Sequence, residues 1–357
     1  MKISKVILSM FLLSVLIISC NDDDDIIEPK GDYENGLLIS GEGSGTVSGS
    51  VSFVSNDFVT VEHSIYNKVN AGKEFSTFLQ SLAFDGENAY ICVDSQNSIT
   101  AVNRYTFEEV GVITEGLALP RYMTVVGDKG YATNWGTGAY GADVDDDFVA
   151  VIDLNSLTVT NTISVGIGPE RIIENNGKLY VSHKGGFSSN NVITVIDIAT
   201  QNTSEIVVKY KPDDLLFDNQ NNLVVLCEGN GPWSAGGETE GAIVKINTSN
   251  NTVISEMIFN SGDHPLFLVK YENDLYYNVG SEIYNLSQTA TELATSSLLT
   301  SEAALQYDGG LEIKDGQLFI LNPNYTGLSQ LDIYDLNTKV KTNSLEAPVA
   351  ASKIYFN

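Results

Sequence analysis

From residue 36 onward the sequence consists of short apolar runs that recur at a regular spacing. The clearest unit contains four such runs, at residues 148–153, 159–165, 171–174 and 179–182. The pair Asn176-Gly177 separates the last two runs, and Asn-Gly between apolar runs is typical of a tight β-hairpin. No helical spacing of apolar residues competes with this pattern after the N-terminal segment. Each unit therefore predicts four short antiparallel strands.

Units of this kind recur along the chain, and none of them can bury both of its faces alone. Stacking the units radially buries these faces and hides most sheet edges. The sequence therefore predicts an all-β fold, a seven-bladed β-propeller of four-stranded antiparallel blades. The inner strands of the seven blades are expected near Leu82, Met123, Ile172, Leu215, Leu268, Ile313 and Ile354.

The two ends of the chain are expected to share one blade. The N-terminal part of the repeat region offers only three strands, at residues 37–40, 50–54 and 58–65. The C-terminus offers a single further strand, at residues 350–356. We therefore expect residues 36–357 to form one propeller, closed by the C-terminal strand in a three-plus-one arrangement.

The first twenty residues have a different pattern. Lys2 and Lys5 precede an apolar run over residues 6–18, which ends at Ser19-Cys20. A basic start, a short apolar run and a small residue at its end are typical of a secretory signal peptide. A small residue before a cysteine resembles a bacterial lipobox. We therefore expect a signal peptide at residues 1–19 and a lipid on Cys20 as the only membrane anchor.

An acidic segment follows the expected lipidation site. Residues 21–25 are one Asn and four Asp, which resembles the surface-export signal of Bacteroidetes lipoproteins. The alternative is a solvated spacer. Residues 20–35 carry few large apolar groups, so we expect a flexible acidic tether. The expected location is the outer membrane, with the propeller exposed at the cell surface.

Charge and cysteine content narrow the possible partners. The chain has 46 acidic and 19 basic residues, a formal net charge of −27. Such a surface repels phosphate backbones, so nucleic acid is not an expected partner. Cys92 and Cys227 lie in apolar runs of different units, and we expect both to pack as small hydrophobic side chains. We expect a monomer.

Candidate binding residues gather at one face of the expected ring. The loops after the fourth run of each unit, such as the one after Tyr180-Val181-Ser182, share this face with the Gly-x-x-Pro turns before the inner strands. Several of these loops are long and glycine-rich, and they contain both tryptophans of the chain. Loop aromatics favour a binding surface, and the alternative is that they cover neighbouring strands. The candidate ligand-binding side chains are Trp135, Tyr140, His183, Phe187, Trp233 and Tyr325.

Polar residues beside the proline turns are expected to point into the mouth of the central channel. They are Arg121, Tyr122, Glu170, Arg171, Asp213, Asp214 and His264. Because the set mixes both charges, we expect internal salt bridges. The alternative is a ring of ligand contacts made by Arg121, Arg171, Asp213 and His264.

One acidic loop raises the question of a metal. Asp143, Asp145 and Asp147 are candidate Ca²⁺ ligands, because hard cations bind several carboxylates. The loop lacks the spacing of an EF-hand, so a solvated acidic loop is the alternative. The sequence has no Gly-x-Ser-x-Gly, no His-Glu-x-x-His and no paired cysteine motif. A binding protein is therefore favoured over an enzyme.

The repeat pattern of residues 36–357, a strand ending in Asp, a turn, a second strand and Gly-x-x-Pro, resembles the YVTN-type, YncE-like propeller repeat family. Together with the lipobox, the acidic run and residues 128–136, it is similar to surface propeller lipoproteins of Bacteroidetes. That group includes cobalamin-capturing propellers that sit over a TonB-dependent transporter. The resemblance implies capture of a small nutrient such as cobalamin, or of a glycan, for an outer-membrane transporter. A protein-interaction or adhesion propeller is one alternative, and a metal-dependent propeller hydrolase or lactonase is the other.

Overall fold

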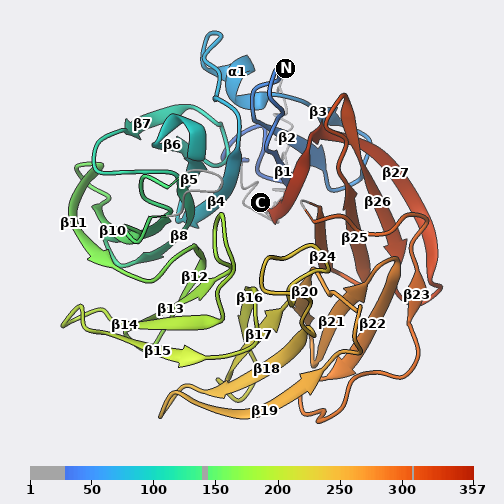
Figure 1. The fold of residues 1–357 in the computed structure, drawn as a ribbon. Helices are drawn as coiled ribbons and strands as arrows, with labels where there is room; N and C mark the ends of the chain where they lie inside the picture. The colour runs from blue at the N-terminus through green and yellow to red at the C-terminus, as the bar shows by residue number, and fades with distance from the viewer. Residues whose placement is uncertain (1–28, 139–143, 308) are drawn as a thin grey trace, which may run out of the picture.

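The computed structural model describes residues 29–138, 144–307 and 309–357. The predicted sites at Cys20, Tyr140 and Asp143 lie outside these described residues. Seven four-stranded antiparallel sheets form a ring around a central channel (Figure 1). This arrangement confirms the predicted seven-bladed β-propeller.

Six blades follow the chain from the inner to the outer strand. Blade 1 contains β4 (Leu79–Asp85), β5 (Asn88–Val93), β6 (Ser98–Asn103) and β7 (Glu109–Ile113). Blade 2 contains β8 (Pro120–Val126), β9 (Lys129–Asn134), β10 (Phe148–Asp153) and β11 (Thr158–Ser164). Blade 3 contains β12 (Pro169–Asn175), β13 (Lys178–His183), β14 (Val192–Asp197) and β15 (Thr203–Val207).

The next three blades repeat this order. Blade 4 contains β16 (Pro212–Phe217), β17 (Leu223–Cys227), β18 (Ala242–Asn247) and β19 (Thr252–Ile258). Blade 5 contains β20 (Leu268–Tyr271), β21 (Asp274–Val279), β22 (Glu282–Ser287) and β23 (Leu299–Thr300). Blade 6 contains β24 (Gly310–Lys314), β25 (Gln317–Asn322), β26 (Leu328–Asp335) and β27 (Val340–Val349).

Blade 7 joins the two ends of the chain. Its strand order is β28 (Ala351–Phe356), β1 (Gly36–Gly41), β2 (Ser50–Ser55) and β3 (Val61–Glu62). The C-terminal strand β28 pairs antiparallel with β1 and takes the inner position. The ring is therefore closed by one C-terminal and three N-terminal strands, as the sequence predicts.

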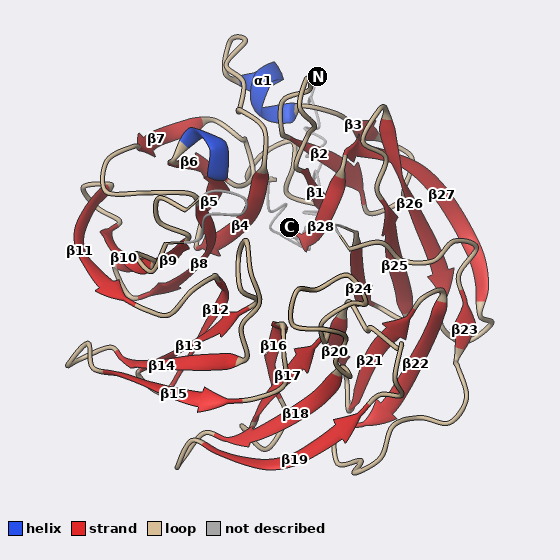
Figure 2. Cartoon of the chain, in the orientation of Figure 1, coloured by secondary structure: helices blue, strands red, loops and turns tan. Residues whose placement is uncertain are grey.

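One expected strand is largely replaced by a helix. The sequence analysis predicts a strand over residues 58–65, but β3 is only two residues long and is followed by α1 (Ile65–Val69). Ser64 has a left-handed backbone with φ 52°, which ends the extended segment. Ile65 and Tyr66 then turn into the core, and α1 lies outside the ring of strands (Figure 2).

The predicted tether ends earlier than residue 35. Tyr33 is buried, and its ring makes edge-to-face contacts with Phe53 and Phe107. Its backbone N–H donates to the carbonyl of Tyr105 at 2.9 Å. The aromatic ring of Tyr33 therefore holds the chain against blades 7 and 1 before the first strand begins.

The hydrophobic core lies between neighbouring blades. The second strand of a blade is covered on both faces, so every residue of β17 is buried. The outer strands are mostly exposed, as in β15 and β19. Cys92 in β5 and Cys227 in β17 are free and fully buried, which confirms that they pack as small hydrophobic side chains. The described residues contain no helix with the length and hydropathy that a bilayer span requires.

A local irregularity at the start of several inner strands positions the channel mouth. The pairing register shifts between Pro120 and Met123, and the same shift follows Pro169 and Pro212. Inner strand β4 has a comparable shift between Leu79 and Ser81 without a proline, so the irregularity belongs to the start of these inner strands and proline, which has no N–H for the ladder, is compatible with it. Hydroxyls of the second strand bind the freed backbone groups, as when Tyr122 N–H donates to Thr133 Oγ1 at 3.0 Å.

Candidate functional site

The irregular strand starts carry charged side chains that bond to one another. Arg121, after the first proline, donates from Nη1 to Asp94 Oδ2 at 2.9 Å. Its Nη2 donates to Glu170 Oε1, also at 2.9 Å. Asp94 belongs to blade 1 and Glu170 to blade 3, so Arg121 links three successive blades.

A second group of ion pairs continues around the channel from blade 3 to blade 4. Arg171 lies 2.8 Å from Asp213 Oδ1 and 2.7 Å from Asp214 Oδ1. Lys184 Nζ lies 2.6 Å from both Asp213 Oδ2 and Glu228 Oε1. Each of the three basic groups thus has two acidic partners, which confirms the predicted internal salt bridges. We call these residues the charged belt; they are Asp94, Arg121, Glu170, Arg171, Lys184, Asp213, Asp214 and Glu228.

Burial and pairing compete in setting the ionisation of the charged belt. Burial opposes the charge on Asp213, but Lys184 and Arg171 outweigh it and hold the pKa of this carboxyl well below its usual range. For Glu228 burial dominates and raises its pKa to about 7, although Lys184 partly offsets it. Burial likewise raises the pKa of Asp94 and of Asp214 above the usual carboxyl range, so within the belt pairing outweighs burial at Asp213 but not at these two carboxyls or at Glu228.

Blades 6 and 7, across the channel from the belt, carry two further buried charged side chains. Glu312 on β24 and Lys353 on β28 line a cavity of ≈ 40 Å³, together with Arg171 and Asp214. Burial raises the pKa of Glu312 to about 7, and burial lowers that of Lys353 to about 8, with a further contribution from Arg171. Organic ligands occupy pockets of about 300–1,000 Å³, so this cavity has room only for water-sized molecules.

Trp135 covers the charged belt. Its ring lies over the guanidinium of Arg121, 3.7 Å from the ring centroid, and its Nε1 donates to the carbonyl of Pro169 at 2.9 Å. Phe187 packs edge-to-face on the same ring, with the centroids 5.4 Å apart. Trp135 and Phe187 therefore follow the alternative in the sequence analysis, in which loop aromatics cover neighbouring strands.

The two histidines predicted at this face have their ring nitrogens engaged within the protein. His183 is fully buried, with Nδ1 3.1 Å from the carbonyl of Ile167 and Nε2 2.8 Å from Thr194 Oγ1. Burial lowers its pKa to about 4. His264 Nδ1 lies 2.9 Å from the Glu228 carbonyl, and Nε2 lies 3.2 Å from Glu238 Oε1. His183 is thus part of the core and not of a ligand surface.

The acidic loop before β10 uses two carboxylates locally. Asp146 accepts hydrogen bonds from the N–H and the hydroxyl of Thr137, the latter at 2.6 Å. Asp147 is buried and accepts from the Gly168 N–H, also at 2.6 Å. Asp145 is exposed. Within the described residues no three His, Cys, Asp or Glu side chains are grouped to hold a metal, and with Asp143 outside them the calcium site stays a prediction.

The exposed aromatic side chains share one face of the ring. Among the described residues, every aromatic side chain that is more than a third exposed lies in a loop before an inner strand or after a second strand. These loops are at the end of the channel where the belt lies. We call the set the aromatic face; it consists of Phe78, Tyr210, Trp233, Tyr307 and Tyr325.

Only part of the aromatic face is visible in the sequence. Trp233 and Tyr325 lie in long loops that the sequence analysis selected. Phe78, Tyr210 and Tyr307 lie in the turns before inner strands and are not among the predicted binding residues. Their place one to three residues before an inner strand is the signal that could have identified them. Lys184 Nζ lies 4.0 Å from the centroid of the Tyr307 ring, so the aromatic face adjoins the charged belt.

Comparisons with known proteins concern the family and the fold. A family model described as "Domain of unknown function (DUF5074)" matches residues 35–320. No curated protein matches the chain. The periplasmic gluconolactonase PpgL of Pseudomonas aeruginosa is 10% identical with a TM-score of 0.66, covering 90% of this chain and 98% of its own.

Two further solved structures have the same ring architecture. A functionally unknown protein from Desulfotomaculum acetoxidans DSM 771 is 14% identical with a TM-score of 0.64, covering 90% of this chain and 98% of its own. The dihydro-heme d1 dehydrogenase NirN is 12% identical with a TM-score of 0.55, covering 92% of this chain and 77% of its own. At such low identity these similarities concern the fold alone.

Proposed function

The chain belongs to the family described as domain of unknown function DUF5074. Because this family description names no function, we propose one from the geometry of the chain itself. The protein is a non-catalytic, cell-surface lipoprotein that binds its ligand on the aromatic face. The ligand is a small nutrient or a glycan, which is passed to an outer-membrane transporter. The observation that carries this proposal is the restriction of the exposed aromatic side chains to one face.

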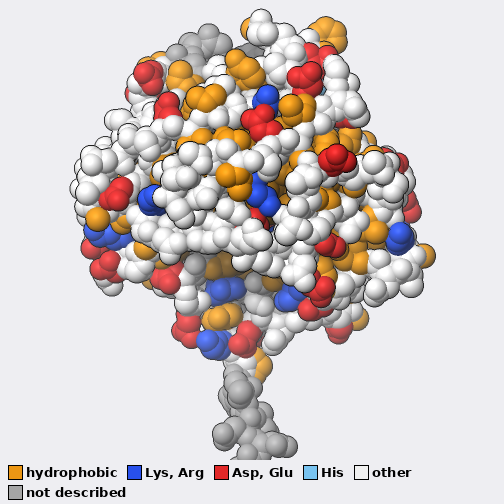
Figure 3. Space-filling model, turned by 90° about the horizontal axis from the view of Figure 1, so that it is seen from below, with side chains coloured by type: hydrophobic (Ala, Val, Ile, Leu, Met, Phe, Trp, Pro, Cys, Tyr) orange, Lys and Arg blue, Asp and Glu red, His pale blue; other side chains and the backbone are white. Residues whose placement is uncertain are grey.

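The chemistry of the aromatic face supports a neutral ligand. Exposed rings provide flat apolar surfaces with polar edges, which suit ligands that combine hydroxyl groups with apolar C–H surface. The net charge of −27 disfavours anions, and acidic side chains occur in several separate groups on the side of the ring shown in Figure 3. The small channel cavity supports binding on the face and not inside the ring.

The location is part of the same proposal. The apolar N-terminal run, the small residue before Cys20 and the acidic residues 21–25 support a lipid anchor and export to the cell surface. The resemblance of the repeats to YncE-like surface propellers of Bacteroidetes supports the link to a TonB-dependent transporter.

A protein partner is the second candidate. Trp233 is 96% exposed, and tryptophan is enriched among the side chains that dominate protein–protein binding energy. The same face would then form an adhesion or interaction surface. A metal-dependent hydrolase or lactonase gains no support from His183 and His264, whose ring nitrogens already bond within the protein.

Calorimetry with the full-length protein in a sugar-free detergent tests the proposal. The probes are cobalamin and a panel of neutral oligosaccharides. One probe is expected to bind, and Trp233→Ala should weaken that binding by about tenfold or more, equivalent to about 1.4 kcal/mol. Val340→Ala, at an exposed position on the outer strand β27, is the control and should leave binding unchanged.

Two other outcomes would contradict the proposal. Binding that survives substitution of Trp233, Tyr325 and Tyr307 would place the ligand away from the aromatic face. Failure of every probe to bind, with a membrane protein retained by wild-type protein and lost in Trp233→Ala, would favour the protein partner.

A further inference from the structure

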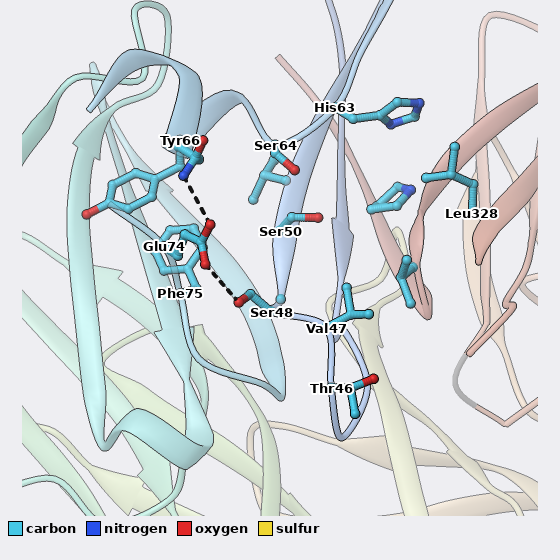
Figure 4. A pocket seen from close by; sticks show the side chains of 15 residues that line it. Thr46, Val47, Ser48, Ser50, His63, Ser64, Tyr66, Glu74, Phe75 and Leu328 are labelled. Carbon is cyan, nitrogen blue, oxygen red and sulfur yellow. Dashed lines mark hydrogen bonds between the residues drawn. The ribbon is translucent and has the colours of Figure 1, made fainter. Parts of the chain in front are cut away.

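A pocket on the rim of the ring shares no lining residue with the charged belt or the aromatic face. It is a cavity of ≈ 370 Å³ between blades 7 and 6, and no sequence motif pointed to it. Its walls are the β1–β2 hairpin, the start of β2, the segment from His63 through α1, the segment at Glu74, and the facing ends of β26 and β27. We call it the α1 pocket (Figure 4).

The α1 pocket opens on the same side of the ring as the binding loops. The β1–β2 hairpin follows the second strand of blade 7, and α1 lies in the connection from blade 7 to the inner strand of blade 1. Reciprocal backbone hydrogen bonds between Ser44 and Val47 close the tip of the hairpin. The cavity falls within the range of about 300–1,000 Å³ that is typical of small-molecule sites.

The pocket offers hydroxyl groups with unused hydrogen-bonding capacity. The side-chain hydroxyls of Thr46, Ser50 and Ser64 line it, and none of them bonds to another group in the described part of the chain. Figure 4 shows the Ser50 and Ser64 hydroxyls directed toward the side of the pocket on which Leu328 lies. A hydroxyl both donates and accepts, so these groups match a ligand that does the same.

A carboxylate and an imidazole complete the polar lining. Glu74 accepts from Ser48 Oγ and from Asn67 Nδ2, both at the long distance of 3.4 Å, so a ligand hydroxyl could donate to it at a better distance. His63 Nδ1 lies 2.9 Å from Ser52 Oγ, which orients the ring on the pocket wall. Its Nε2 is 3.8 Å from Glu346. Two carboxylates at or near the pocket disfavour an anionic ligand.

The opposite wall is apolar. Leu328 of blade 6 lies across the pocket from Ser50 and Ser64, and Val47 extends from the hairpin (Figure 4). Val349 of blade 6 also lines the pocket. Val47 and Leu328 are both more than a third exposed, so an occupant would remove apolar surface from water. A sugar ring has this combination of hydroxyl edges and an apolar C–H face.

We propose that the α1 pocket binds a single neutral sugar unit, held by the hydroxyls of Ser50 and Ser64 against Val47 and Leu328. The assignment goes beyond the proposed function, because the pocket shares no residue with the aromatic face. Glu74 accepts a hydrogen bond from a hydroxyl of the sugar, and the pocket excludes uronic acids by charge.

Ligand-observed NMR and calorimetric titration of the full-length protein in a sugar-free detergent test this site. The probes are glucose, galactose, mannose, fucose, rhamnose and N-acetylglucosamine, with glucuronate as the anionic comparison. At least one neutral sugar is expected to bind, and glucuronate is expected to bind at least tenfold more weakly than the best of them.

Three variants locate the binding. Val47→Trp fills the pocket and should abolish binding, whereas its matched control Val340→Trp should not, because both positions are exposed valines. The double change Ser50→Ala, Ser64→Gly should weaken binding about tenfold, since two hydrogen bonds of about 0.5–1.5 kcal/mol each are lost. Glycine at position 64 accommodates φ 52° without strain, so the fold is retained.

The outcomes separate this pocket from the aromatic face. Loss of sugar binding in Val47→Trp but not in Trp233→Ala supports the α1 pocket. The reverse pattern overturns it and leaves the proposed function standing. Binding of none of the neutral sugars, or tighter binding of glucuronate, also overturns it.

Discussion

The two tryptophans of the chain lie in equivalent loops of blades 2 and 4, yet their surroundings are opposite. Trp135 directly follows β9, stacks on Arg121 and bonds to Pro169. Trp233 lies further along the loop after β17 and is 96% exposed. The same loop of a blade can therefore hold a tryptophan that packs over the channel mouth or one that projects into solvent. Residue type does not separate the two cases, because the packing around each ring decides which occurs.

The same contrast holds for the charged belt and the aromatic face. The belt is buried, and each of its basic groups has two acidic partners. The aromatic face adjoins it but is exposed. We therefore expect substitutions in the belt to change the free energy of unfolding, and substitutions on the aromatic face to change binding.

Arg171→Ala should have the largest effect on stability. It leaves Asp214 and part of Asp213 buried without their partner, and removing one member of a buried pair costs about 3–5 kcal/mol. Chemical denaturation measures the loss. Lys129→Ala, at an exposed position, should change stability by about 0.5 kcal/mol or less. A loss below about 1 kcal/mol in Arg171→Ala would contradict a structural role for the belt.

Trp135→Ala should come next, with a loss of about 2 kcal/mol. This is less than the about 3–5 kcal/mol for a fully buried tryptophan, because the ring is only half-buried. The same substitution at position 233 is the matched control. Equal losses in the two variants would remove the distinction between the tryptophans.

A smaller effect is expected from a charge outside the belt. No ion pair holds Glu312 among the described residues, and its pKa is raised to about 7. Because the folded state binds this proton more tightly than the unfolded state does, stability from this group is present below pH ~4.5 and is lost as the pH rises through about 7. Between pH 5 and 7.5 the free energy of unfolding should therefore fall in both proteins, but by about 1–2 kcal/mol less in Glu312→Gln than in wild type.

Denaturation of both proteins at the two pH values tests this prediction. The pKa of Glu228 is also raised to about 7, so the decrease of stability with rising pH should be smaller in Glu312→Gln than in wild type, but still present. An unchanged slope in Glu312→Gln would show that this carboxyl does not titrate in that window.

The smallest energetic effect is expected at Trp233. Trp233→Phe should change the free energy of unfolding by about 0.5 kcal/mol or less, because the exposed ring has few contacts to lose. Acrylamide should quench the fluorescence of Trp233 in a Trp135→Phe variant far more than that of Trp135 in Trp233→Phe. Similar quenching in the two variants would show that Trp233 is covered.

The fold follows from the sequence because each blade repeats the same local signals. Asn176-Gly177 fixes a hairpin, and the surplus strand at the C-terminus requires the shared blade. Tyr33 and α1 escaped prediction because they are held by contacts with distant residues such as Phe107 and not by a local pattern. Tertiary contacts of this kind override local propensity.

The candidate sites are harder to predict for the same reason. Mixed charges beside the prolines indicated the ion pairs, but only the packing shows that Trp135 covers them and that His183 lies in the core. The α1 pocket brings together residues near positions 47, 64 and 328, which share no sequence motif. Sites assembled from segments so far apart leave no signal in a short stretch of sequence.

The closing strand has a consequence for how the protein is made. β1 is among the first strands to be synthesised, but its inner neighbour β28 is the last, and the hydroxyls of Ser40 and Ser352, 3.3 Å apart, lie 312 residues apart in sequence. The ring therefore cannot close before β28 has been synthesised, and such long-range pairing is slow to form. Removal of β28 would leave the inner edge of β1 without a partner and the seventh blade with three strands.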